Sequence, residues 1–235
     1  YKDPLDRRFH AQPNACDVCG PHVELKDKTG APVSCEDEIA ELLRQIQGGK
    51  IAAVKGLGGF HLVCDAANAV AVSELRRRKH RPFKPFAVMT LNDLSASRFV
   101  RISEKASKEL HSPQAPIVLC PKTNDADRLL PGIAPELNRI GIMMPYTPIH
   151  WLLFFEAIGR PDWYKKECDL VLVMTSANAG GEPLVIGNDE AVQKLDGIAD
   201  LFLTHNRDIL IRCDDSVMQQ RDQDVQLIRR ARGFT

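Results

Sequence analysis

The sequence predicts an α/β fold in which one sheet, with at least some parallel pairing, is covered by helices on both faces. Short, nearly continuous apolar runs recur along the chain, as is typical of strands buried on both faces. Helical patterns lie between several of these runs. The composition agrees with a globular protein, since 44% of the 235 residues are hydrophobic and 26% are charged.

The first predicted helix has the clearest signals. Ser34 suits the N-cap position, with Asp37 three residues later. Apolar residues then repeat at the spacing of one helical face, at Ile39, Leu42, Leu43 and Ile46. Gly48 and Gly49 end the helix.

The later elements alternate along the chain. Apolar runs predict strands at 51–54, 86–89, 116–120, 140–144, 170–174, 201–203 and 225–228. Helical patterns lie at about 68–79, 103–110, 148–158 and 188–195. Residues 121–139 form the longest apparent loop, and such loops within a compact domain are often functional.

The first 35 residues differ from the rest of the chain. They are polar, contain four prolines and hold the only close pair of cysteines, Cys16 and Cys19. We therefore predict a tail or small module at 1–35 and a main domain at 36–235.

Charge and hydropathy exclude several classes of protein. Lys and Arg number 31, as do Asp and Glu, so the chain lacks the basic field of a dedicated nucleic-acid binder. No apolar run approaches the roughly 18 residues of a membrane span. The opening YKDPLDRRFH has neither a starting Met nor a signal peptide, which points to a fragment of a longer chain. Seven cysteines, an odd number, argue against a disulfide scaffold and for a reducing, cytoplasmic setting.

Cys16 and Cys19 have the spacing with which two thiolates grip one zinc ion. A closed structural site needs four ligands, and no second close pair of cysteines follows. His10 and His22 are candidates to complete a site within the chain, although nothing in their spacing requires it. We favour the alternative, which is half of a zinc site whose partners precede Tyr1.

A basic run, RRRKHRPFK, lies at 76–84. Such a run usually marks only a solvated helix end, where cations suit the helix dipole. Here it continues into a loop bounded by two prolines, which restrict the backbone. The loop would therefore hold Lys79, Arg81 and Lys84 in fixed directions that suit phosphate or carboxylate ligands. Arg76 precedes the loop and is expected to matter little.

Small polar side chains follow the predicted strand at 170–174. Thr175, Ser176 and Asn178 come where that strand ends, and open α/β sheets bind ligands at the carboxyl ends of their strands. A polar turn is the plainer interpretation, and the two glycines that follow would serve it too. The pattern of a Walker loop is absent.

Three C-terminal segments each follow or bound an apolar run, at 205–208, 214–216 and 229–233. Their His, Asp and Arg residues are, taken singly, more often surface groups than catalysts. Together they supply donors and carboxylates that suit a nucleotide with Mg²⁺.

The order Lys79-x-Arg81, then Ser176-x-Asn178 far downstream, resembles the K-x-R…S-x-N signature of the YrdC-like ATP-dependent adenylating domains. The resemblance implies a twisted, open, mixed sheet flanked by helices. One subfamily makes threonylcarbamoyl-adenylate for tRNA modification and carries P-T-D/E-T-x-Y-G-L after its first strand. The corresponding residues 55–65 read KGLGGFHLVCD, so the threonine-facing residues are missing and this activity is the less favoured alternative.

Residues 55–65, with the motifs H-R-P-x-K-P, H-N-R-D-I and D-D-S-V, instead resemble the hydrogenase maturation carbamoyltransferases, the HypF family. The opening segment is similar to the end of that family's second zinc module. The resemblance extends from Asp3 to Gly233. It implies that 1–35 is a zinc-finger remnant with its linker and that 36–235 is a YrdC-like ATP-binding adenylating domain.

The family resemblance also implies an activity. Such an enzyme cleaves carbamoyl phosphate to carbamate, adenylates the carbamate with ATP and passes the carbamoyl group to a C-terminal cysteine of a maturation partner. That group becomes the cyanide ligands of nickel–iron hydrogenase. The expected cofactors are ATP and Mg²⁺, with Zn²⁺ in the full-length protein. A membrane partner is not expected. An RNA-binding module is the alternative from another class, and zero net charge with 6% aromatic residues argues against it.

The same resemblance assigns roles to particular residues. The expected catalytic cations, which would neutralise carbamate and phosphate, are Lys79, Arg81 and Lys84. The side chains expected to bind the nucleotide or its Mg²⁺ are Thr175, Ser176, Asn178, His205, Asn206, Arg207, Asp215, Ser216 and Arg230. Cys16 and Cys19 would belong to the incomplete zinc site. The segment 56–59, without a threonine pocket, suits a substrate as small as carbamate.

Overall fold

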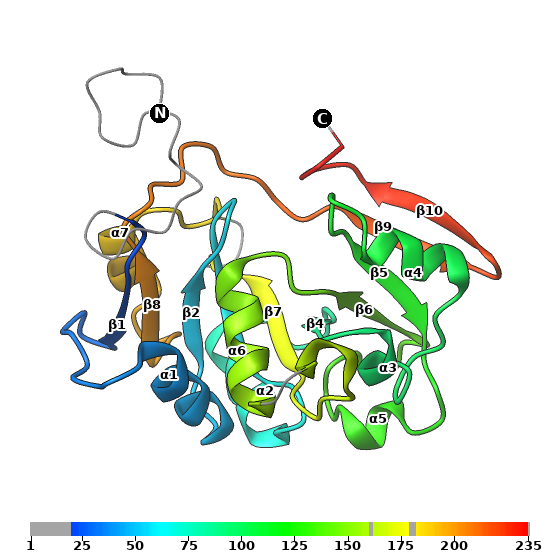
Figure 1. The fold of residues 1–235 in the computed structure, drawn as a ribbon, viewed down its shortest axis with the longest axis horizontal. Coiled ribbons are helices and arrows are strands. Elements are labelled where there is room, and N and C mark those ends of the chain that lie inside the picture. The colour runs from blue at the N-terminus through cyan, green and yellow to red at the C-terminus, as the bar shows by residue number, and fades with distance from the viewer. Residues whose placement is uncertain (1–19, 160–161, 179–181, 235) are drawn as a thin grey trace.

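Ten strands form one mixed, twisted sheet in the part of the chain that the computed structural model describes, residues 20–159, 162–178 and 182–234 (Figure 1). The strands are β1 Val23–Asp27, β2 Ala52–Lys55, β3 Phe60–Asp65, β4 Ala87–Met89, β5 Ile117–Pro121, β6 Arg139–Met143, β7 Leu172–Ser176, β8 Leu201–His205, β9 Val217–Arg221 and β10 Asp224–Arg229. Their order across the sheet is β1-β8-β2-β3-β7-β4-β6-β5-β9-β10.

The sheet combines both kinds of pairing, as predicted. Three neighbouring pairs are parallel: β2 with β8, β4 with β6 and β5 with β9. The other neighbouring pairs are antiparallel, including β3 with β7 at the centre. Because β3 enters the sheet where β7 leaves it, residues at these two ends lie side by side.

Helices cover both faces of the sheet, as the apolar strands predicted. They are α1 Glu38–Gln47, α2 Ala69–Arg78, α3 Asp93–Ala96, α4 Glu104–Leu110, α5 Ala126–Leu129, α6 Pro148–Ile158 and α7 Asn188–Lys194, with a 3₁₀ turn at Trp163–Lys165. The buried apolar residues of α1 and α6 belong to one core cluster, on the near face in Figure 1. Those of α2, α4 and α7 belong to a second cluster on the other face.

Helix α1 follows its predicted apolar pattern, but its beginning differs. The N-cap is Asp37 rather than Ser34, because the Asp37 carboxylate accepts hydrogen bonds from the backbone N–H groups of Ile39 and Ala40. Gly48 is the C-cap. The buried residues are the four of the predicted face, Ile39, Leu42, Leu43 and Ile46.

Three strands were not predicted from the sequence. β1 (VELKD) and β9 (VMQQR) are largely polar, and β3 (FHLVCD) adjoins a glycine-rich turn. The expected long loop 121–139 also contains the short helix α5. The polar strands are held by their neighbours in the sheet rather than by their own pattern.

The position of β1 bears on the predicted boundary between residues 35 and 36. β1 lies before that boundary, yet it pairs with β8 along its whole length, from Val23 opposite His205 to Asp27 opposite Leu201. The sheet of the main domain therefore begins by residue 23. The division into a zinc-module remnant and a YrdC-like domain remains a prediction. No helix among the described residues is both long and apolar enough to cross a membrane.

Candidate active site

The basic run leaves α2 and turns back toward the sheet. α2 begins after its N-cap Asn68 and ends at its C-cap Lys79. His80 then takes a φ of +50°, in the left-handed region, which carries the chain out of the helix. The turn leaves the side chain of Lys79 against the carboxyl end of β7.

Lys79 lies in a cage of oxygen atoms. Its Nζ donates to the backbone oxygens of Ser176 and Asn178, both at 2.7 Å, and to Oδ1 of Asn178 at 3.0 Å. Only 7% of the residue is exposed. Burial, together with the positive charges of Arg81 and Lys84, lowers the pKa of Lys79 to about 8. The two halves of the K-x-R…S-x-N pattern therefore meet.

Arg81 reaches the same end of β7 from the next turn of the loop. Its guanidinium donates to Oγ1 of Thr175 at 3.0 Å and to the backbone oxygen of Pro85. It also lies 5.0 Å from the ring centroid of Phe86. Burial, with a smaller contribution from the charge of Arg76, lowers the pKa of Arg81 to about 10. Arg81 thus remains cationic at neutral pH.

The contacts of Arg76 contradict the expectation that this residue matters little. Its guanidinium donates to the backbone oxygens of Arg81, Pro82 and Lys84 in the loop, at 2.9–3.2 Å. It also donates to Gly132, at 2.7 and 2.9 Å. Arg76 therefore braces the loop that carries Lys79 and Arg81, because its long side chain folds back over the helix end.

Of the remaining cations of the run, Lys84 and Arg77 are exposed and Arg78 is half-buried. Lys84 is exposed, and its backbone oxygen, rather than its ammonium, takes part in the loop contacts. Arg77 and Arg78 both form ion pairs with Glu74, and Arg78 also pairs with Asp200. The structure thus brings two of the three predicted catalytic cations to the end of β7 and leaves Lys84 at the surface.

Ser176 and Asn178 form one connected turn. Ser176 Oγ donates to Asn178 Oδ1 at 2.9 Å, and Asn178 Nδ2 donates to the backbone oxygen of Glu182 at 2.7 Å. An ammonium, that of Lys79, already lies among the oxygens that were expected to serve Mg²⁺. Nor do the described residues gather three or more His, Cys, Asp or Glu side chains suited to a metal ion. These residues do not fit a protein-held Mg²⁺ site.

The residues at the end of β8 lie in a different part of the sheet. The side chain of Asn206 accepts from His22 N at 2.9 Å and donates to Gly20 O at 3.2 Å, so it ties down the N-terminal segment. His205 Nδ1 accepts from Arg207 N at 3.3 Å. Burial and, to a smaller extent, the charge of Lys55 lower the pKa of His205. These contacts do not join the three residues to Lys79.

Asp215 and Ser216 hold the C-terminal segment in place. Ser216 is fully buried, and its Oγ donates to Arg232 O and accepts from Ala231 N, at 3.0 and 2.8 Å. Asp215 pairs with Arg232 at 2.9 Å. Arg230 is exposed, and its guanidinium donates to the backbone oxygen of Phe234.

A buried cluster beside Asp215 was not anticipated from the sequence. Asp215 Oδ2 lies 3.2 Å from Nε2 of His61, and the guanidinium of Arg232 lies 4.0 Å above the ring of Tyr146. The Tyr146 ring meets that of His150 edge to face, with centroids 4.7 Å apart. His61 stands inside the K-G-L-G-G-F-H-L motif, so the motif marked it, but nothing local marked Tyr146 or His150.

The pKa values of Asp215 and His150 in this cluster are both shifted far below their ordinary values. Burial raises the pKa of Asp215, but hydrogen bonds and charges from His61 and Arg232 outweigh it and hold that pKa well below its usual range. Burial, and then the neighbouring His61, lowers the pKa of His150 to about 3. Asp215 is therefore ionised and His150 neutral at physiological pH.

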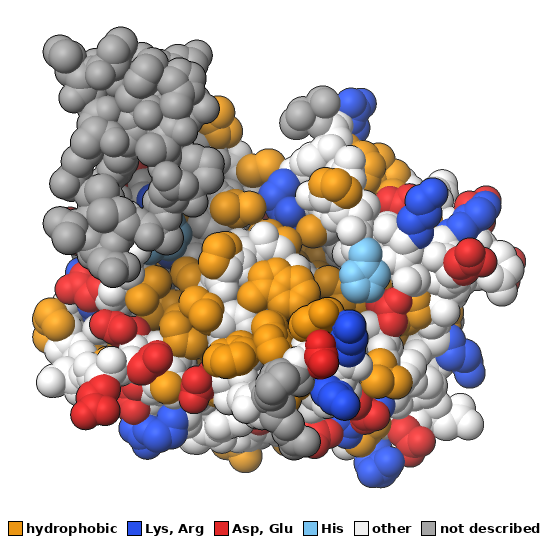
Figure 2. Space-filling model, in the orientation of Figure 1, with side chains coloured by type: hydrophobic (Ala, Val, Ile, Leu, Met, Phe, Trp, Pro, Cys, Tyr) orange, Lys and Arg blue, Asp and Glu red, His pale blue; other side chains and the backbone are white. Residues whose placement is uncertain are grey.

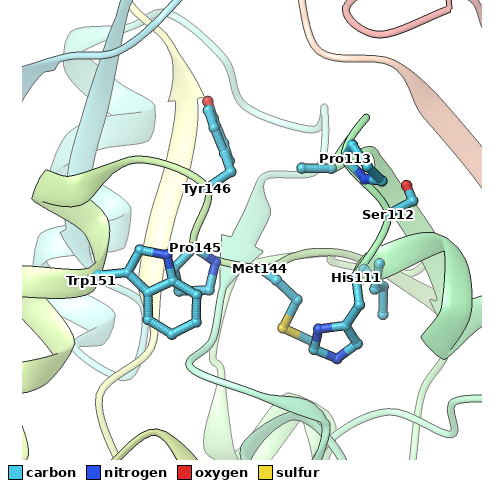
Figure 3. A pocket seen from close by; sticks show the side chains of 9 residues that line it. His111, Ser112, Pro113, Met144, Pro145, Tyr146 and Trp151 are labelled. Carbon is cyan, nitrogen blue, oxygen red and sulfur yellow. The ribbon is translucent and has the colours of Figure 1, made fainter. Parts of the chain in front are cut away.

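A pocket of about 270 Å³ opens on the outer side of Tyr146 (Figure 3). Trp151 and Pro145 lie on one side of it, and His111, Ser112 and Pro113 lie on the other. The residues that line it are Leu110, His111, Ser112, Pro113, Ala115, Met144, Pro145, Tyr146 and Trp151. Tyr146 therefore belongs both to the lining of this pocket and to the cluster around Asp215.

Hydrophobic side chains also gather on the surface over α6, in the middle of the face shown in Figure 2. Trp151, Leu152 and Phe155 are 39%, 46% and 44% exposed. The opposite side of the helix packs Leu153 and Phe154 into the core. α6 is thus apolar on its exposed side as well as its buried side.

The mixed sheet and the Lys–Arg pair against a Ser-x-Asn strand end define a YrdC-like domain. A family model, Sua5/YciO/YrdC, described as telomere recombination, matches residues 44–231, so the chain belongs to this family. A second model, the HypF finger, matches residues 1–25. Within the family, the chain is the YrdC-like domain of the HypF proteins, together with part of their zinc finger.

Named relatives support this placement. Carbamoyltransferase HypF2 of Cupriavidus necator is 53% identical over 90% of this chain, which corresponds to 27% of that protein. Carbamoyltransferase HypF of Rhodobacter capsulatus is 48% identical over 99% of the chain and 29% of that protein. The crystal structure of a full-length HypF in the phosphate- and nucleotide-bound form matches the whole chain, with a TM-score of 0.84 and 43% identity.

These comparisons confirm the predicted family and fold class. The chain spans less than a third of the length of these HypF relatives. Cys16 and Cys19 fall within the zinc-finger match but outside the described residues, so their zinc site stays a prediction.

Proposed function

We propose that this chain is the carbamoyl-adenylate-forming domain of an ATP-dependent carbamoyltransferase that acts in the maturation of nickel–iron hydrogenase. One observation carries the proposal. Lys79 is a buried cation and Arg81 a half-buried one, and their ammonium and guanidinium donate to neutral carbonyl, amide and hydroxyl oxygens. Buried charges normally need a counter-charge, so an anionic ligand is the missing partner.

The proposed reaction supplies two such anions. An oxygen of carbamate attacks the α-phosphorus of ATP, the bond from that phosphorus to the bridging oxygen of pyrophosphate breaks, and carbamoyl-adenylate and pyrophosphate result. Carbamate and the triphosphate repel each other in water. Lys79 and Arg81, held by Ser176, Asn178 and Thr175, would offset this repulsion without having to reorganise.

The nucleotide would lie against the end of β7, close to Thr175 and Ser176. A HypF relative has been solved with a nucleotide bound, which supports ATP as the ligand. Mg²⁺ would accompany the ATP phosphates, because the oxygens of Ser176 and Asn178 are already bonded to Lys79. The placement of Asn206 and Arg230 argues against a direct role in this nucleotide contact.

The rest of the proposal concerns the longer enzyme. Carbamate would come from carbamoyl phosphate, and the acceptor would be the C-terminal cysteine of a hydrogenase maturation partner in the cytoplasm. The relatives are named carbamoyltransferases, which supports the transfer of a carbamoyl group. Zn²⁺ would belong to the finger that contains Cys16 and Cys19.

Exchange of labelled pyrophosphate into ATP tests the adenylation step on the 235-residue chain. We expect exchange with ammonium carbamate and no further stimulation by threonine. Exchange that requires bicarbonate plus threonine would instead assign the chain to threonylcarbamoyl-adenylate synthesis. Absence of exchange, combined with no calorimetric binding of ATP at millimolar concentration, would overturn the proposed function.

A further inference from the structure

Phe86 lies immediately before β4, where the loop of the basic run enters the sheet. Its side chain is 1% exposed and belongs to the core cluster that also contains the buried residues of α2. Its backbone N–H donates to the carbonyl of Ile133 at 3.0 Å, and the guanidinium of Arg76 donates to the same oxygen at 3.1 Å. Core packing and this hydrogen bond therefore fix the position of the ring.

Two guanidinium groups lie over the ring of Phe86. The Cζ atom of Arg76 is 4.4 Å from the ring centroid, and that of Arg81 is 5.0 Å from it. The face of an aromatic ring carries partial negative charge, so it attracts both cations. An aliphatic side chain of similar size would fill the core without attracting either of them. The ring thus does more at this position than fill space.

The two cations over the ring repel each other. After burial, the charge of Arg76 is the further cause that lowers the pKa of Arg81. Both guanidiniums donate to neutral oxygens, and within residues 20–159, 162–178 and 182–234 neither forms an ion pair with a carboxylate. The partial negative charge of the Phe86 ring therefore offsets a repulsion that no acidic side chain of this region offsets.

The contacts of Arg81 leave part of its guanidinium for a ligand. Its Nε donates to Lys84 O at 3.3 Å, one Nη donates to Thr175 Oγ1 at 3.0 Å, and the other donates to Pro85 O. Each Nη carries a second hydrogen that these contacts do not use, and a carboxylate or phosphate binds such hydrogens. Their direction depends on the plane of the guanidinium, which lies over the Phe86 ring.

We propose that Phe86 is a positioning residue for the adenylation step: its ring holds the Arg81 guanidinium so that the unused N–H groups face the reacting anions. The inference rests on the proposed function. In this assignment Phe86 contacts neither carbamate nor ATP and acts on the reaction through Arg81. Its contact with Arg76 serves the loop instead. A ring face with less negative charge should therefore weaken the reaction through Arg81 and the stability of the fold through Arg76.

The test changes the charge on the ring face while keeping the shape of the ring. Monofluorinated and then trifluorinated phenylalanine at position 86 withdraw electrons from the face stepwise and change the volume little. We expect kcat/KM for carbamate-dependent pyrophosphate exchange by the 235-residue chain to fall stepwise, by up to about tenfold. Phe86→Leu, which removes the ring, should lower it at least as far.

Phe99 provides a matched control. It is likewise 1% exposed and belongs to the same core cluster. The cation–π contacts among the described residues involve the rings of Phe86, Tyr164 and Tyr146, and not that of Phe99. The same fluorinated residues at position 99 should therefore leave the exchange rate unchanged, whatever they do to the melting temperature.

Arg81→Met separates positioning from folding. With the guanidinium of Arg81 removed, fluorination at position 86 should no longer change the residual exchange. Its effect on the free energy of unfolding acts through Arg76 and should persist. A purely structural role of Phe86 would lower exchange by the same factor in both backgrounds.

Three results would overturn the assignment of Phe86 and leave the proposed function intact. One is an exchange rate that neither fluorination nor Phe86→Leu changes. The second is a loss that persists in full in Arg81→Met, and the third is an equal loss on fluorination of Phe99. A wild-type chain without carbamate-dependent exchange would instead overturn the proposed function, and this assignment with it.

Discussion

Two cations that lie close together at the end of α2 have opposite environments, one exposed and one buried. The side chain of Arg77 is 71% exposed and bonds the carboxylate of Glu74 one turn back. Lys79, two residues later, is 7% exposed, and its ammonium bonds neutral oxygens of Ser176 and Asn178. The turn at His80 separates the two groups.

This difference shows how a run of like charges can hold more than one function. An exposed ion pair such as Arg77–Glu74 is complete and contributes little to stability. A buried cation with only neutral partners lacks a counter-charge. The lowered pKa of Lys79 reflects the cost of burying its positive charge. The inward cations are therefore the ones to test for anion binding, and the outward ones are their controls.

The largest effect is expected when the inward cations are removed. Lys79→Met and Arg81→Met should each lower carbamate-dependent pyrophosphate exchange by about 100-fold or more, since each removes a charge aimed at the reacting anions. Methionine retains most of the aliphatic volume, and removing a buried charge that lacks a counter-charge offsets the hydrogen bonds lost at Ser176, Asn178 and Thr175, so the melting temperature should change little. If these variants lost only as little exchange activity as Arg77→Ala, the whole run would be no more than a charged surface.

Arg76 should affect stability rather than the chemistry. Arg76→Ala removes the contacts with the loop carbonyls and with Gly132, and leaves those carbonyls without this partner. We expect the free energy of unfolding to fall by about 2 kcal/mol, measured by urea titration. An unchanged midpoint would show that Arg76 does not brace the loop.

The pKa of Lys79 predicts a smaller, pH-dependent effect. Its folded pKa of about 8 lies below the ordinary value of 10.5, so the folded chain loses this proton first as the pH rises. Anions bind the protonated form, and their affinity should therefore fall by up to about tenfold between pH 7 and 9. Calorimetry with ATP can measure this slope, which should flatten in Lys79→Met.

The same titration affects stability with the opposite sign. Between about pH 8 and 10.5 the unfolded chain binds more protons at Lys79 than the folded chain does, so this residue makes the fold more stable as the pH rises. A contribution in the other direction would contradict the burial of its ammonium.

The smallest effect is expected at Arg77. Arg77→Ala removes an exposed pair with Glu74 and should leave both the exchange rate and the melting temperature within experimental error. A loss comparable to that of Lys79→Met would erase the distinction between the two halves of the run.

Local pattern was sufficient for much of the fold. The apolar face of α1 and the strands at 170–174 and 201–203 follow from periodicity, because a side chain's burial there depends on its near neighbours. β1 and β9 could not be found in this way, since their polar residues become strands only through pairing with β8 and with β5 and β10.

The candidate site also has one part that local motifs predicted and another that only the tertiary structure determined. The sequence by itself determined the family and the paired signature of Lys79, Arg81, Ser176 and Asn178, because each half is a short motif. Tertiary structure alone decided that Arg76 braces the loop, that Lys84 stays outside and that His61 meets Asp215, 154 positions away. Such contacts depend on strand order and on the path of the chain between strands, and no local pattern encodes either.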